Sequence, residues 1–96
     1  MTIKKFYAII YQPGSAWKPG VSVYKQDLRS HATYMEKLHK DKVLVLGGPF
    51  TDDSGGMAII NVESEEKAEE ILEQDPAITN KVMKATIKPW HIAFEQ

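Results

Sequence analysis

The stretch VLVLGGPFTDDSGGMAIINV, residues 43–62, contains two short apolar segments separated by a polar turn. Residues 43–50 are aliphatic and β-branched until two glycines and a proline interrupt them, and residues 56–62 form a second run of the same kind. The small and acidic residues DDSG between them are typical of turns. The stretch therefore predicts a β-hairpin.

Helices are predicted on both sides of this hairpin. In the segment before it, which runs to about Asp41, apolar residues recur at the spacing of one helical face. They are Leu28, Ala32, Met35 and Leu38. After the hairpin, Ser64 is suited to cap a second helix, and the acidic residues of its first turn favour the helix dipole. We expect Pro76 to end this helix, whose apolar face is Ala68, Ile71 and Leu72.

Both ends of the chain are predicted to form strands. Residues 3–11 are aromatic and β-branched at both alternating sets of positions, as in a central strand that is covered on both faces. Residues 82–88 alternate, and we expect Pro89 to shift the register as a bulge. The residues that would then take over are Trp90, Ile92 and Phe94. Residues 12–20 contain two Pro-Gly pairs around Trp17, which predicts an irregular loop with an exposed tryptophan.

The element order β-α-β-β-α-β is that of the ferredoxin-like fold, an α+β arrangement. In this fold two helices cover one face of a four-stranded antiparallel sheet. The 96 residues suffice for one domain, residues 1–96. The opposite face of the sheet would remain bare, although the first and third strands are apolar on both sides. We therefore expect a homodimer that packs sheet against sheet.

Composition narrows the classes of function. Twelve basic and thirteen acidic residues give a net charge of -1, so no basic surface for nucleic acid is expected. An 18-residue apolar stretch and a signal peptide are both missing, so we expect a cytoplasmic protein without a membrane partner. The chain has no cysteine, His31 and His39 are eight positions apart, and Asp52 and Asp53 lack the spacing of a calcium loop. We expect neither a metal nor another cofactor.

Two polar residues fall on the predicted inward faces. His31 lies on the apolar stripe of the first helix, and Asp75 continues the stripe of the second. A buried aspartate without a partner is costly, whereas one held against an imidazole is satisfied and fixes its tautomer. As a pair, His31 would move a proton and Asp75 would orient it. A structural interpretation stays open, with His31 bonded to a backbone carbonyl and Asp75 capping a helix end.

Three further residues are candidates for binding a small molecule. Gly48 and Pro49 end a strand, where glycine lets a ligand approach the backbone closely, although the same residues end ordinary strands. Trp90 is a candidate pocket wall, but such aromatic residues also occur in cores and interfaces.

Motifs in order along the chain resemble the YCII-related family: H-x-x-Y-M from His31, LVLGGPF, D-x-x-G-G, V-x-S-x-E-x-A, Asp75-Pro76 and I-K-P-W. The resemblance implies a ferredoxin-like fold that forms dimers of the α+β barrel kind, with a histidine and an aspartate as an active-site pair under the sheet. Some relatives are dehydrochlorinases of chloroaromatic breakdown, and muconolactone isomerases share the wider fold. Relatives often carry an arginine where this chain has Leu28, so no anion-binding role is assigned to Arg29.

These observations support a cofactor-independent acid–base enzyme, a lyase, isomerase or dehydrochlorinase, that uses His31 and Asp75. One alternative is a non-catalytic binding or sensor module, in which His31 serves only as a hydrogen-bond partner. Another is a haem-binding or monooxygenase-type protein of the dimeric α+β barrel group, with His31 as the axial ligand.

Overall fold

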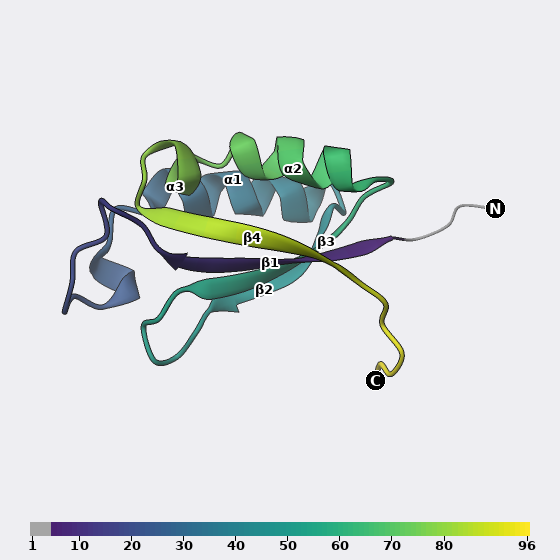
Figure 1. Cartoon of the computed structure of the whole chain (residues 1–96), viewed down its shortest axis with the longest axis horizontal. Coiled ribbons are helices and arrows are strands. Elements are labelled where there is room, and N and C mark those ends of the chain that lie inside the picture. Colours follow the sequence, from purple (N-terminus) through teal and green to yellow (C-terminus); the bar gives the residue numbers. More distant parts are fainter. Residues whose placement is uncertain (1–4) are drawn as a thin grey trace.

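The computed structural model describes residues 5–96 as a four-stranded antiparallel sheet with helices on one face (Figure 1). The strands are β1 (Phe6–Pro13), β2 (Leu44–Pro49), β3 (Gly56–Asn61) and β4 (Met83–Trp90). The helices are α1 (Arg29–Lys40), α2 (Glu65–Glu73) and α3 (Pro76–Thr79), and η1 (Val23–Lys25) is a single 3₁₀ turn. The strand order β2-β3-β1-β4 puts the first and third strands in the centre. The predicted ferredoxin-like fold is confirmed.

The hydrophobic core lies between the sheet and the helices. On β1 the alternate residues Tyr7, Ile9 and Tyr11 are buried in it, as the two-residue period of a strand requires. The intervening Ala8 and Ile10 are only partly buried. Among residues 5–96, the expectation that β1 is covered on both faces is therefore not met, because α1, α2 and α3 lie on the same side of the sheet (Figure 1).

The predicted hairpin is present, and it closes tightly against the end of β1. Gly55 has a φ of 136°, and a Cβ at this position would lie 2.0 Å from the carbonyl oxygen of Tyr11. Only glycine permits both the backbone angle and this close approach. The turn also carries Asp53, whose carboxylate accepts the backbone N–H of Val23 at 3.1 Å. The hairpin turn is thus joined to the segment that leads into α1.

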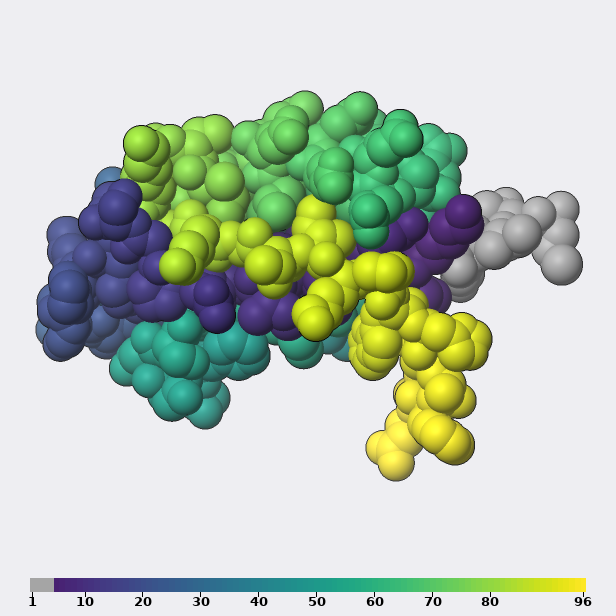
Figure 2. Space-filling model, in the orientation of Figure 1, coloured from purple at the N-terminus to yellow at the C-terminus, as the bar shows by residue number. Residues whose placement is uncertain are grey.

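The predicted bulge at Pro89 is wrong. The pairing of β4 with β1 runs without a shift to Phe6 and Trp90. β4 is an edge strand, where a proline removes no hydrogen bond that the ladder needs. Ile92 and Phe94 lie beyond the strand, in the C-terminal segment that leaves the body of the molecule (Figure 2).

Two other expectations are corrected. Trp17 is partly buried and packs against the core, and the residue before it, Ala16, donates its backbone N–H to the carbonyl oxygen of Lys81 at 2.8 Å. The second helix ends at Glu73, so Asp75 does not continue its stripe but caps α3. Pro76 does follow the end of α2, and it also occupies the first turn of α3, where its missing N–H has no helical partner to lose.

Two residues of the predicted first strand, Ile3 and Lys4, lie outside the described residues. None of the helices in residues 5–96 has the length and apolar character of a membrane span.

Candidate functional site

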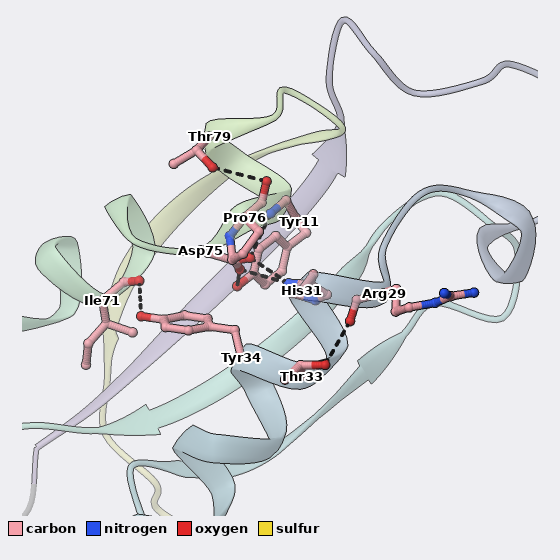
Figure 3. Close-up of polar contacts among 10 residues, drawn as sticks. Tyr11, Arg29, His31, Thr33, Tyr34, Ile71, Asp75, Pro76 and Thr79 are labelled. Carbon is pink, nitrogen blue, oxygen red and sulfur yellow. Dashed lines mark hydrogen bonds and ion pairs between the residues drawn. The ribbon is translucent and has the colours of Figure 1, made fainter.

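Asp75 lies at the centre of a buried group of hydrogen bonds (Figure 3). Its Oδ1 accepts the backbone N–H of Ala77 at 2.9 Å, which caps α3. The hydroxyl of Tyr11 donates to Oδ2 at 2.8 Å. His31 Nδ1 lies 2.8 Å from Oδ1 and 2.9 Å from Oδ2. The predicted pairing of His31 with Asp75 is therefore present, and Asp75 also caps a helix, as its structural interpretation anticipated.

These contacts define the state of the imidazole. Ala77 N–H and the Tyr11 hydroxyl both donate to the carboxylate, so its two oxygens act as acceptors. An ionised carboxylate only accepts, so Nδ1 of His31 carries the shared proton. In the neutral ring, Nε2 then holds the free lone pair. The arrangement leaves His31 able to accept a proton at Nε2.

The His31 ring packs against the sheet, and the helix that carries it is joined to α2. The residue lies in the first turn of α1, and its ring packs edge-on against Tyr11 with centroids 5.4 Å apart. Tyr34, farther along α1, donates its hydroxyl to the carbonyl oxygen of Ile71 at 2.7 Å and so joins α1 to α2. The His31 side chain is 18% exposed, whereas that of Asp75 is 1% exposed. The buried aspartate thus supports a histidine that can be reached from outside.

His31 lines a pocket of about 750 Å³, within the range of small-molecule sites. One wall is the end of β2, with Gly47, Gly48 and Pro49, and another is the segment of residues 23–29. Apolar side chains contribute much of the remaining lining: Met35, Leu44, Met57 and Met83. The structure therefore brings Gly48 and Pro49 to the same pocket as His31.

Trp90 does not line this pocket. It lies at the far end of β4, paired with Phe6, and lines a second pocket of about 590 Å³ with Pro89 and His91. Arg29 lines the first pocket, but its side chain points away from the imidazole of His31 (Figure 3).

Tyr11 and Gln26 are not among the residues predicted from the sequence. Tyr11 continues the inward positions of β1, and a buried tyrosine hydroxyl needs a partner, so its contact with a buried acid was open to inference. Gln26 is buried and holds the loop over the core. Its side chain accepts the N–H of Lys18 at 2.8 Å and donates to the carbonyl oxygens of Lys18 at 2.8 Å and Val21 at 3.0 Å. Nothing in the sequence pattern indicates these bonds, because their partners are backbone groups.

The tyrosines near Asp75 are held in their protonated forms. Burial, reinforced by the negative charge and hydrogen bond of Asp75, raises the pKa of the Tyr11 phenol well above its usual value. Burial and the charge of Asp75 also raise the pKa of Tyr34. Both hydroxyls therefore remain donors at neutral pH. In the described part of the chain, no three His, Cys, Asp or Glu side chains form a group that could hold a metal ion.

Comparisons with known proteins agree with this fold. The model of the YCII-related domain matches residues 6–91. The uncharacterised protein YjpA of Bacillus subtilis (strain 168) is 32% identical over 68 residues, which are 71% of this chain and 80% of YjpA. Among solved structures, 5-chloro-2-hydroxyhydroquinone dehydrochlorinase (TftG) from Burkholderia phenoliruptrix AC1100, in complex with 2,5-dihydroxybenzoquinone, is similar with a TM-score of 0.65 and 26% identity. The match covers 88% of this chain and 93% of TftG. The chain belongs to the YCII-related family.

Proposed function

We propose that this protein is an acid–base enzyme, a lyase or isomerase, that acts on a small hydroxylated ring. His31 moves the proton and Asp75 holds the imidazole in the required tautomer. The observation that carries the proposal is the bond of His31 Nδ1 to the buried Asp75 at 2.8 Å, with the same ring lining a pocket of about 750 Å³. A general base of this kind needs no bound cofactor.

The shape and lining of the pocket support this class of substrate. Its apolar side chains suit the faces of a flat ring, and the glycines of β2 allow the ring to approach the backbone. Removal of hydrogen chloride from a ring requires a group that takes up the proton as chloride leaves, and isomerisation requires one that takes up and returns it. The similar dehydrochlorinase TftG was solved with a dihydroxybenzoquinone, which favours hydroxylated rings.

The test is a turnover assay with chlorinated hydroxyhydroquinones and with lactones. Chloride release and product formation are followed for the unmodified protein and for two variants. His31→Asn should lower kcat by about 10²–10⁴-fold, the usual contribution of a general base. His39→Asn is the matched control, because His39 lies on the same helix, is exposed, and is not part of the pocket lining. Its activity should be unchanged.

Two results would contradict the assignment. One is activity that survives in His31→Asn. The other is tight binding of a ring compound with no turnover of any substrate in the panel, which favours the non-catalytic binding module instead. Asp75→Asn should lower kcat in the same direction as His31→Asn, but by less, because the base itself is retained.

We also propose that the open face of the sheet packs against a second copy of the chain. The strand register puts Leu46, Ile59 and Ala8 in one row across this face. Leu46 is 58% exposed and Ala8 is partly buried, whereas Ile59 between them is buried. Trp90, at the end of the neighbouring edge strand, is 48% exposed. Exposed apolar side chains that lie together on one face favour association with a partner that removes them from water. Sedimentation velocity should show a dimer that Leu46→Asp dissociates and Thr33→Asp, on the exposed side of α1, leaves intact. A monomeric unmodified protein refutes this proposal.

A further inference from the structure

Tyr11 contacts both members of the His31–Asp75 pair. Its hydroxyl donates to Asp75 Oδ2 at 2.8 Å, and its ring packs edge-on against the imidazole at 5.4 Å. Tyr11 is 3% exposed and lies near the end of β1. The backbone of Gly55 lies directly against the carbonyl oxygen of Tyr11 and so limits its position. Tyr11 therefore reaches the carboxylate from the sheet, whereas His31 reaches it from α1 (Figure 3).

The contact matters because the two donors share a single carboxylate. His31 Nδ1 lies at nearly equal distances from the two oxygens, 2.8 and 2.9 Å, so it draws on the charge of both. A donor bonded to Oδ2 withdraws part of that charge. The bond from Tyr11 thus weakens the bond that Asp75 can make to His31.

We propose that Tyr11 is a positioning residue that sets the strength of the His31–Asp75 hydrogen bond. The hydroxyl acts through Asp75 and forms no bond to the imidazole. The hydrogen-bond relation stands on the geometry alone, whereas its importance for turnover rests on the proposed function. Without the hydroxyl, the carboxylate has one donor fewer, and the bond to His31 Nδ1 becomes stronger.

Tyr34 supplies a matched control. Its hydroxyl also makes a short hydrogen bond, to the carbonyl oxygen of Ile71 on α2 at 2.7 Å, but it makes no hydrogen bond to Asp75. Tyr11→Phe and Tyr34→Phe each remove one oxygen and keep the ring. A merely structural effect of losing a tyrosine hydroxyl should therefore appear in both variants.

The experiment is proton–nitrogen NMR of the histidine side chains in the unmodified protein and both variants. The Nδ1 proton of His31 resonates farther downfield as its hydrogen bond strengthens. We expect a downfield shift in Tyr11→Phe and none in Tyr34→Phe. An unchanged resonance in Tyr11→Phe, or an equal shift in both variants, overturns the proposal.

A second substitution keeps the proposal testable if Tyr11→Phe does not fold. Incorporation of 3,5-difluorotyrosine at position 11 keeps the hydroxyl and makes it a stronger donor, so the Nδ1 proton should move upfield. A downfield shift or no shift refutes the proposal. Neither measurement needs a substrate. The absence of turnover would therefore count against the proposed function but not against the role of Tyr11. A His31 Nδ1 proton that does not shift would count against the role of Tyr11 but not against the proposed function.

Discussion

Asp75→Ala should lower the free energy of unfolding by about 2–6 kcal/mol. The substitution removes the acceptor of two buried donors, the Tyr11 hydroxyl and the Ala77 N–H, and each unsatisfied donor costs about 1–3 kcal/mol. The second of these losses includes the helix cap of α3, which alone is worth about 0.5–2 kcal/mol. His31 adds little, because its partly exposed ring can change tautomer or bond to water. A domain of this size is stable by only about 5–15 kcal/mol, so the loss should be large.

Urea unfolding followed by circular dichroism measures this loss. Asp75→Asn is the graded comparison, since its amide oxygen can still accept the Ala77 N–H and its amide nitrogen can donate to the tyrosine oxygen. It should cost about 1–2 kcal/mol, near the net value of a hydrogen bond. Asp41→Ala removes an exposed carboxylate at the end of α1 and should stay within about 0.5 kcal/mol of the unmodified protein. If Asp75→Ala costs less than about 1 kcal/mol, the donors do not depend on this carboxylate and the reasoning is wrong.

Other regions of the molecule yield three further predictions. Because burial raises the pKa of Tyr11, the folded state keeps a proton that unfolded tyrosine loses near pH 10. The free energy of unfolding should therefore fall by about 1.4 kcal/mol per pH unit above that pH, and urea unfolding of Tyr11→Phe should lack this component, whereas an identical slope contradicts it. In thermal unfolding, Gly55→Ala should lower the free energy of unfolding by about 2 kcal/mol or more, because the residue has a positive φ and its new Cβ would clash with β1. Gly20→Ala should cost only about 1 kcal/mol, because Gly20 has a φ of 75° but open space around it. Gln26→Ala should release the loop it holds, and limited proteolysis should then cut within residues 14–25 before the rest of the chain; uniform cleavage would count against that role.

Local pattern was sufficient for most of the fold. The hairpin of residues 43–62 and the helical stripe ending at Leu38 follow from spacing and turn residues, which depend only on near neighbours in the chain. The element order then leaves few topologies, and the ferredoxin-like one is present. The bulge predicted at Pro89 is absent because the effect of a proline depends on whether its strand lies at the edge of the sheet, which is a property of the whole sheet.

The sequence by itself determined the four strands and the two longer helices, their order and the inward position of His31, and it suggested Asp75 as a partner across 44 residues. Only the tertiary structure decided what Asp75 does. It is the cap of a separate short helix, and it receives Tyr11 from a strand 64 positions away. The tertiary structure also shows that Trp90 lies outside the His31 pocket and that Gly48 and Pro49 line it. The physical reason is that periodicity reports which face of an element is buried, whereas hydrogen-bond partners depend on how distant elements pack to within about 3 Å of one another.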